Sequence, residues 1–439
     1  MLVEQKSRLL QISAAVIGNA LEWYDFIVFG FMTGIIANVF FPAQNAYSSL
    51  LLTTASFGVG FALRPLGGIM IGAFSDRRGR RAALQLIIGL MTIATALIAF
   101  APPYAVIGLA SSLIIVTARM LQGLATGGEF ASATAFLIEI APKHRQGLYG
   151  SWQMFGQGLA MLIGAAVGAT LTRLLSHDQL YAWGWRIPFI LGLAIAPVGF
   201  WIRRHLQETA FEPADKSAAT QRKLSMGAEL LQHPRALLAS FLLTTSATIS
   251  FYVLVIYLPT FANKSLHIAL DDAFAAQCVG IVVMITLTPI FGLISDYVNR
   301  RGLVKVSLLV YLLLLYPCFS WLTAAPSMMR FMAMQIVLCG VFGAFLGPYS
   351  TAVAQQFSTR VRSTGMAISY NMAVMVFGGF AQFIVTWLLH TTGSLLTPAF
   401  YLIFGAVAGL AGSFLLVQGR RTVQGTNSDA LSTEMPLVR

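Results

Sequence analysis

Two stretches of the sequence, separated by about half of its length, follow one pattern: Gly72-Ala-Phe-Ser-Asp76-Arg77-Arg78-Gly79-Arg80-Arg81 and Gly292-Leu-Ile-Ser-Asp296-Tyr-Val-Asn-Arg300-Arg301. Both read G-x-x-S-D-x-x-x-R-R. A second pair of short stretches lies at nearly the same offset: Arg145-Gln-Gly147 and Arg362-Ser-Thr-Gly365. Two matches at one offset predict a chain built from two copies of one unit.

The segments between these loops are strongly apolar. Of the 439 residues, 57% are hydrophobic and 10% are charged, whereas soluble domains carry about 25% charged residues. A helix needs roughly 20 apolar residues to cross a bilayer. We therefore expect an all-α membrane protein. The sequence predicts twelve spans, with eleven or thirteen left open by weak separations, near residues 11–38, 50–74, 82–100, 109–138, 147–171, 184–202, 236–262, 273–294, 303–323, 329–356, 364–389 and 395–417.

The formal net charge of +12 reports topology rather than nucleic-acid binding. With both termini placed in the cytoplasm, the outer loops hold four of the 28 Lys and Arg residues, and two more lie within spans. All the others face the cytoplasm, as the positive-inside rule requires. The four outer residues are Arg173, Arg186, Lys264 and Arg330.

The repeat and the polar stretches predict the domain organisation. We expect two six-helix halves at 1–202 and 236–417, a cytoplasmic linker at 203–235 and a cytoplasmic tail at 418–439. Parallel halves related by an axis along the membrane normal suit alternating access to a central site. We expect the protein to work as a monomer in the lipid bilayer.

Several other classes of function find no support in the sequence. The cysteines Cys278, Cys318 and Cys339 lie in apolar segments without CxxC or metal-ligand spacing. The first apolar segment runs past Phe40 without a cleavage signal, so we expect it to be retained as a span. There is no phosphate-binding loop and no legible Ser/His/Asp or Cys/His set. We expect no enzyme activity, no metal and no cofactor, with the proton as coupling ion.

The first copy of the repeated loop, Gly72 to Arg81, resembles the loop signature of the major facilitator superfamily, G-x-x-x-D-R/K-x-G-R/K-R/K, at every position. Arg119-Met-Leu-Gln122-Gly123 is similar to that family's fourth-helix signature. The second copy of the loop departs from the signature at Tyr297 and Asn299. The resemblance implies a twelve-helix transporter.

Narrower similarities concern one branch of that superfamily. The stretches that resemble metabolite–proton symporters are Gly18-Asn19-Ala-Leu-Glu22-Trp-Tyr-Asp25-Phe, Gly60-Phe-Ala-Leu-Arg64-Pro65 and Trp183-Gly-Trp185-Arg186-Ile-Pro188-Phe. The stretches most similar to citrate and tricarballylate symporters are His177-Asp178, Ser151-Trp152-Gln153 and Arg203-Arg204-His-Leu-Gln-Glu208-Thr. The resemblance implies a multi-pass protein of the bacterial inner membrane.

Five ionisable side chains lie within the predicted spans: Glu22, Asp25, Arg64, Arg119 and Glu129. Charges in hydrocarbon are costly and usually functional. Three acids face two arginines, so one acid is left over as a proton carrier. An arginine whose partner acid takes up a proton can then bind a substrate carboxylate. The alternative is a set of static ion pairs that hold spans 1, 2 and 4 together.

The candidate site residues fall into three groups. The substrate-binding candidates are Arg119, Arg64, Asn19, Gln122, Gln153, Gln157, Tyr252, Tyr257 and Asn371, with Tyr370 beside the last of these. The proton-coupling candidates are Glu22, Asp25 and Glu129. The cytoplasmic gate candidates are Gly72, Asp76, Arg77, Gly79, Arg80, Arg81, Asp296 and Arg300. Helix packing is the alternative role for the glutamines, and it is the expected role of Gly123-x-x-x-Gly127.

These observations predict a proton-coupled symporter that imports an organic di- or tricarboxylate such as citrate or tricarballylate. One alternative is a symporter of another organic acid or of a zwitterionic osmolyte, although the heptads of an osmolyte carrier's coiled-coil tail are missing after Arg421. Another is a drug–proton antiporter, against which the buried charges argue. A transceptor that senses without net transport also stays open.

Overall fold

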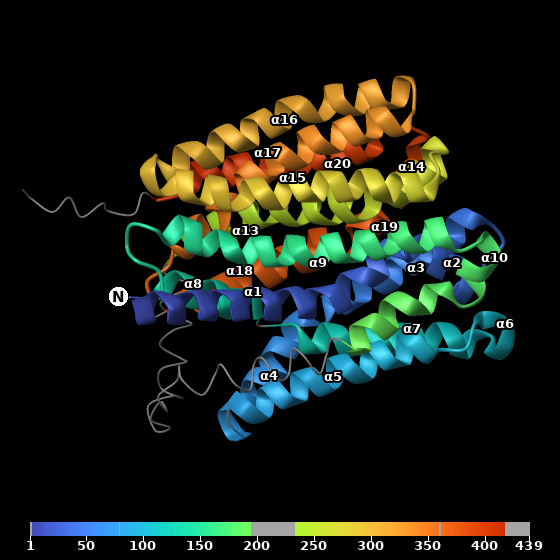
Figure 1. The fold of residues 1–439 in the computed structure, drawn as a ribbon, viewed down its shortest axis with the longest axis horizontal. Coiled ribbons are helices and arrows are strands. Elements are labelled where there is room, and N and C mark those ends of the chain that lie inside the picture. Colours follow the sequence, from blue (N-terminus) through green and yellow to red (C-terminus); the bar gives the residue numbers. More distant parts are fainter. Residues whose placement is uncertain (1, 79, 128, 195–232, 360, 418–439) are drawn as a thin grey trace, which may run out of the picture.

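The computed structural model describes residues 2–78, 80–127, 129–194, 233–359 and 361–417. Within these ranges the chain is helical, without strands (Figure 1). The helices that precede residue 195 are α1 (Leu2–Phe31), α2 (Thr33–Phe40), α3 (Ala46–Ala62), α4 (Arg64–Arg78), α5 (Arg80–Phe100), α6 (Tyr104–Ile107), α7 (Leu109–Ala125), α8 (Glu129–Glu139), α9 (Gln146–Leu174), α10 (His177–Ala182) and η1 (Gly184–Arg186). Those that follow residue 232 are α13 (Pro234–Ser250), η4 (Phe251–Tyr257), α14 (Leu258–Leu266), α15 (Leu270–Tyr297), α16 (Arg300–Ala324), α17 (Met328–Ala354), α18 (Arg362–Ala373), η5 (Val374–Gly378), α19 (Ala381–Thr392) and α20 (Thr397–Leu415).

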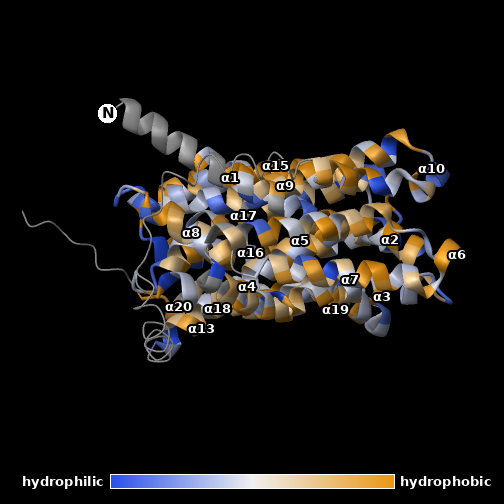
Figure 2. Ribbon diagram, turned by 90° about the horizontal axis from the view of Figure 1, so that it is seen from below, coloured by the Kyte–Doolittle hydropathy of each residue, from blue (hydrophilic) through white to orange (hydrophobic). Residues whose placement is uncertain are grey.

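Each predicted span overlaps described helix, and the sixth, predicted at 184–202, does so as far as Ala194, beyond which it lies outside the described residues. Nine described helices are long and apolar enough to cross a membrane, and the bent pair α1 and α2 makes a tenth. Two shorter apolar helices, Gln85–Phe100 and Gly184–Ala194, lie where the third and sixth spans are predicted. Hydrophilic residues gather toward the two ends of the bundle (Figure 2). The all-α membrane class is confirmed, and the count of twelve stays a prediction.

The domain boundaries also stay predictions. The linker predicted at 203–235 lies outside the described residues except for its last three, and of these Pro234 and Arg235 already belong to α13. The tail predicted at 418–439 lies wholly outside them. Below, helices before residue 195 are called the N-terminal helices and those after residue 232 the C-terminal helices.

Several spans are interrupted, and the sequence explains where. α1 and α2 meet at an angle of 64°, and Thr33 Oγ1 donates hydrogen bonds to the carbonyl oxygens of Phe29 and Gly30 at 3.2 and 2.8 Å. Such back-bonding bends helices. The π-helix η4 runs up to α14, whose second residue, Pro259, has no N–H to continue an α-helical pattern. Irregular turns of this kind often mark functional sites.

Glycines let the second and fourth spans cross with their backbones in contact. A Cβ added at Gly123 would collide with the carbonyl oxygen of Gly60, and one added at Gly127 would collide with the carbonyl oxygen of Arg64. Only glycine permits so close an approach. The expected packing role of Gly123 and Gly127 is confirmed. The crossing brings Arg64 and Arg119 close together.

The N-terminal and C-terminal helices lie side by side along their length (Figure 1). α9 packs along α15 and α17, α3 packs against α19, and α1 packs against α9 and η4. The candidate site lies where these helices meet.

Candidate functional site

Two buried arginines share one aromatic ring. Arg64, the first residue of α4, and Arg119, on α7, expose 2% and 0% of their surface. Their guanidinium carbons lie 4.4 and 4.3 Å from the centroid of the Phe26 ring. The two cations are close enough to repel each other. A ligand that brings a negative charge close to each guanidinium group would relieve that repulsion.

Further rings surround the two cations. The guanidinium carbon of Arg64 lies 4.3 Å from the ring of Phe61 and 5.4 Å from that of Trp23. The guanidinium carbon of Arg119 lies 4.7 Å from each of two other phenylalanine rings. A cation over a ring face is attracted by its quadrupole. We define the aromatic cage as Trp23, Phe26, Phe29, Phe57 and Phe61.

The hydrogen bonds of Arg119 go to neutral oxygens. Its Nη1 donates to Gln122 Oε1 at 2.6 Å and to the carbonyl oxygen of Phe26 at 3.1 Å. In the described part of the chain its Nε and Nη2 have no partner, and neither Arg119 nor Arg64 forms an ion pair. Of the two acids of the first span that could pair with Arg119, Asp25 does not do so in this conformation.

The position of Asp25 explains why. Its side chain is buried, and a Cβ added at Gly192 would collide with its Oδ1, with Thr95 packed against the same glycine. The carboxylate of Asp25 thus lies against the sixth predicted span. The side chains of Glu22 and Glu129 lie outside the described part of the chain, so the coupling roles of all three acids stay predictions.

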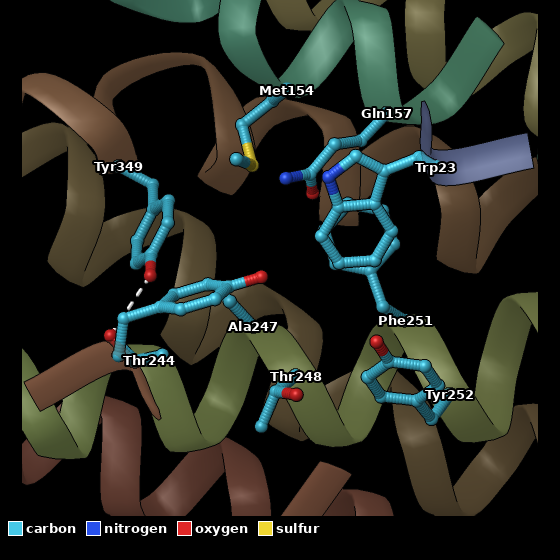
Figure 3. A pocket seen from close by; sticks show the side chains of 10 residues that line it. Trp23, Met154, Gln157, Thr244, Ala247, Thr248, Phe251, Tyr252 and Tyr349 are labelled. Carbon is cyan, nitrogen blue, oxygen red and sulfur yellow. Dashed lines mark hydrogen bonds between the residues drawn. The ribbon is translucent and has the colours of Figure 1, made fainter. Parts of the chain in front are cut away.

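A small central cavity lies beside the aromatic cage. Figure 3 shows Met154 and Gln157, from α9, facing Thr244 and Thr248, from α13, across it. The volume open to the centre of a water molecule is about 10 Å³, roughly what one buried water needs. A citrate-sized molecule requires the helices to separate. The lining residues are Trp23, Met154, Gln157, Thr244, Ala247, Thr248, Phe251, Tyr252, Tyr349 and Tyr370.

Polar atoms without partners suit this cavity to a polar ligand. Among the described residues, Gln157 Nε2, Thr248 Oγ1 and the Tyr252 hydroxyl are buried and lack a hydrogen bond. Each such atom costs about 1–3 kcal/mol while it stays unsatisfied. The amides of Asn19 and Gln153 are likewise buried without partners at Nδ2, Oδ1 and Nε2, but neither residue lines the cavity.

Two predicted substrate ligands are engaged elsewhere. The hydroxyls of Tyr257 and Thr386 share a hydrogen bond of 2.8 Å. Asn371 Nδ2 donates a 2.6 Å hydrogen bond to the carbonyl oxygen of Gly127 and so joins α18 to the N-terminal helices. Neither residue lines the cavity, so direct binding by Tyr257 or Asn371 finds no support in this conformation.

Asp296 joins the N-terminal and C-terminal helices at the end of the bundle that the sequence assigns to the cytoplasm. Its Oδ1 accepts hydrogen bonds from the N–H of Gly147 at 2.6 Å and from Arg300 Nη2 at 2.8 Å, and its Oδ2 accepts one from the N–H of Leu148 at 3.0 Å. Free N–H groups and the positive end of the helix dipole meet at the first turn of α9. A carboxylate of the C-terminal helices therefore caps an N-terminal helix.

The first copy of the loop cannot be compared at the same detail. Gly79 and the side-chain environments of Gly72, Asp76, Arg77, Arg80 and Arg81 lie outside what the structure describes. Their gating roles stay predictions.

Further contacts join the two sets of helices at the same end. Gln146 accepts a 2.9 Å hydrogen bond at its carbonyl oxygen from Thr351 Oγ1, and its side chain accepts one of 3.1 Å from Gln355. Arg362 and Glu139 form an ion pair at 3.7 Å. These contacts hold the N-terminal and C-terminal helices together at the end predicted to face the cytoplasm.

The outer end is closed as well. Thr33 Oγ1 lies 3.2 Å from Gln382 Oε1, within hydrogen-bonding distance. The rings of Tyr47 and His390 stack with their centroids 3.7 Å apart. With contacts at both ends and little space between them, the structure is an occluded form.

Comparison with known proteins identifies the family to which this chain belongs. A family model of the Major Facilitator Superfamily matches residues 26–380, and the chain belongs to that superfamily. The chain is 37% identical over 400 residues to a citrate-proton symporter of Salmonella typhi, with 91% of this chain and 92% of the relative covered. It is 34% identical to a citrate-proton symporter of Klebsiella pneumoniae, with 91% and 89% covered.

Other similar proteins are named for substrates other than citrate. A proline/betaine transporter of Salmonella typhimurium is 31% identical, with 91% of this chain and 81% of the relative covered. The crystal structure of a D-xylose-proton symporter superposes with a TM-score of 0.72 at 18% identity, covering 95% of this chain and 99% of that one. That likeness concerns the fold alone. The predicted family resemblance is confirmed, and the protein is a multi-pass transporter of the bacterial inner membrane, not an enzyme.

The aromatic cage is the feature that sequence reasoning missed. Phenylalanines in apolar segments ordinarily face lipid or the core, and the sequence has 31 of them, so no single one stands out. A signal was nevertheless present. Trp23, Phe26 and Phe29 recur at every third position beside the acidic pair of the first span, and so share one helix face.

Proposed function

We propose that the protein is a proton-coupled symporter that imports an organic di- or tricarboxylate, with citrate and tricarballylate as first candidates. The observation that carries the proposal is the pair Arg64 and Arg119. Both are buried beside one ring, and neither has an acidic partner in the described part of the chain. Two guanidinium groups with unused donors suit a substrate that offers a carboxylate to each. The citrate-proton symporters among the relatives support the same substrate class.

The occluded form suggests how the cycle runs. Opening the outer end requires the contacts of Thr33 and Tyr47 to break, and opening the inner end requires those of Asp296 and Arg362 to break. Only one end opens at a time in alternating access. A proton held by Glu22, Asp25 or Glu129 would accompany the anion and lower the net charge that crosses.

A zwitterionic osmolyte is the second candidate. Aromatic rings from both halves line the cavity, among them Trp23, Phe251, Tyr252 and Tyr349. Such walls can bind a quaternary ammonium group by cation–π attraction, and proline/betaine transporters are among the relatives. Two buried cations beside that cavity disfavour a positively charged head group, so we rank this candidate second.

The test is uptake into proteoliposomes of labelled citrate, tricarballylate, succinate, proline and glycine betaine, with and without an inward proton gradient. We expect the gradient to drive accumulation of a di- or tricarboxylate. Accumulation of betaine or proline alone would replace the proposal with the osmolyte candidate. Accumulation of citrate that does not respond to the gradient would remove the proton coupling.

A further inference from the structure

Part of the hydrogen-bonding capacity of the two arginines is unused among the described residues. Of the buried guanidinium nitrogens, Arg119 Nε, Arg119 Nη2 and Arg64 Nε have no partner among the described residues. The bonds that Arg119 does make end on neutral oxygens of Gln122 and Phe26. An unpaired cation inside a membrane protein is costly. In the described part of the chain, no acidic side chain pairs with either arginine, so the stabilisation that this part offers comes from other groups.

The aromatic cage supplies that stabilisation. All five of its rings lie within 5.4 Å of a guanidinium carbon. The rings also hold one another in place. Phe26 and Phe61 meet edge to face with centroids 4.6 Å apart, and Phe29 and Phe57 stack at 6.1 Å. Cation–π attraction is strongest where water is excluded, as it is here.

The cage borders the cavity through Trp23, whereas the two arginines, Arg64 and Arg119, do not reach it. Tyr252, from the C-terminal helices, lines the cavity too, and its ring packs against those of Phe61 and Phe57 at 5.1 and 5.9 Å. A carboxylate in the cavity reaches the guanidinium groups only after these rings have moved.

We propose that the rings of the aromatic cage take the place of a bound carboxylate in the empty carrier. By cation–π attraction they stabilise Arg64 and Arg119 when no carboxylate is bound, and so let the empty protein pass through the occluded form. This inference rests on the proposed function for the role of the two arginines. Phe26 is the central positioning residue, because among the described rings only that of Phe26 contacts both cations. When substrate binds, its carboxylates contact the two guanidinium groups in place of the rings.

The inference separates two steps of the transport cycle. Exchange of labelled for unlabelled substrate uses only crossings of the loaded protein, whereas net uptake also needs the empty protein to return. Removing a cage ring destabilises the empty occluded form more than the loaded one. Net uptake should therefore fall while exchange persists.

Phe26→Leu removes the ring but keeps a buried apolar side chain. Its matched control is Phe319→Leu, a fully buried phenylalanine on α16 for which no contact with an arginine is found. In citrate proteoliposomes we expect Phe26→Leu to lose about tenfold in net uptake while exchange stays within about twofold. Phe26→Tyr, which keeps the ring, should recover most of the loss. Equal loss of uptake and exchange, or no loss, would overturn the inference.

A second measurement needs no substrate. Spin labels at Gln44 and Thr391 report on the outer end, and labels at His144 and Thr359 on the cytoplasmic end, in a background whose native cysteines are replaced by serine. In the empty protein we expect Phe26→Leu to lengthen the distance between the two labels of one pair, at the outer or at the cytoplasmic end. We expect Phe319→Leu to leave the label distances of both pairs unchanged. Unchanged distances in Phe26→Leu would refute the inference. Failure of wild-type protein to transport any di- or tricarboxylate of the uptake panel would instead refute the proposed function, and the label distances would still test the cage.

Discussion

The carboxylate of Asp296 accepts a 2.6 Å hydrogen bond from the main-chain N–H of Gly147, although the two residues belong to different halves of the chain. The contact is possible because Gly147 has no side chain. A Cβ there would collide with the hydroxyl oxygen of Ser295 and with the carbonyl oxygen of Gly292. The repeated loop motif thus supplies Gly292 and Asp296 to a single junction with α9.

Asp296→Asn should weaken this junction. An amide keeps the shape of the side chain but loses the charge that favours the first turn of a helix and the ion pair with Arg300. We expect molecules open to the cytoplasm to become more populated and transport to slow. Accessibility of a cysteine on the cytoplasmic side of the cavity to a membrane-impermeant reagent measures the shift. Asp178→Asn, which removes an exposed charge at the outer end, is the control. Equal accessibility in both variants would show that Asp296 is not a latch.

Arg119→Lys should weaken substrate binding while the protein still folds and inserts. Lysine keeps the charge but loses the planar fork that grips a carboxylate and stacks on rings. We expect affinity to fall roughly tenfold or more, which corresponds to about 1.4 kcal/mol. Binding of citrate to purified, monodisperse protein measures it. Near-normal affinity would mean that Arg119 has a structural role only, and Arg64 would become the leading candidate for the residue that binds the substrate carboxylate.

Asp25→Asn and Glu22→Gln should uncouple transport from protons. If the acid of the first span carries the proton, neither amide can release one, so gradient-driven accumulation should be lost while exchange survives. Uptake and exchange are compared in the same proteoliposomes, with and without an imposed gradient. Accumulation that persists in both variants would assign the proton elsewhere, with Glu129 next in line.

Gly123→Ala should destabilise the protein at the crossing of the second and fourth spans. The new methyl group would collide with the main chain of Gly60, so we expect a cost of about 1–3 kcal/mol or more. Gly89→Ala is the matched control, because a Cβ there has no neighbour within 4 Å. Thermal unfolding of both purified variants distinguishes them. Similar midpoints would mean that the helices can move apart freely.

The spans were predictable because lipid imposes a strong and simple demand on sequence. Residues that cross hydrocarbon must be apolar over a fixed length, so hydropathy located helices such as α15 and α17 closely. Interruptions inside spans were not predictable in this way. The bend before Thr33 and the π-helix before Pro259 change hydrogen bonding without changing hydropathy.

The charged residues of the site were also found from sequence, but their partners were not. An arginine in an apolar segment announces itself, and a nearby acid is the simplest partner to expect. Asp25 and Phe26 are neighbours on α1, so they project in directions about 100° apart on the helix. The ring faces Arg119, and the carboxylate lies against Gly192. The rotation of α1 about its own axis within the bundle decides whether the ring of Phe26 or the carboxylate of Asp25 faces Arg119.

The buried charged side chains among the described residues are Asp25, Arg64 and Arg119, and all three belong to the N-terminal helices. If the two sets of helices descend from one duplicated unit, as the repeated loop predicts, the N-terminal set holds the buried charges of the described part, while the C-terminal set contributes hydroxyls and rings such as Thr248 and Tyr252 to the cavity. The two copies can then diverge under separate constraints. A chimaera that grafts the C-terminal helices of a betaine-transporting relative onto these N-terminal helices should still select an anion, with its preference for size and shape altered.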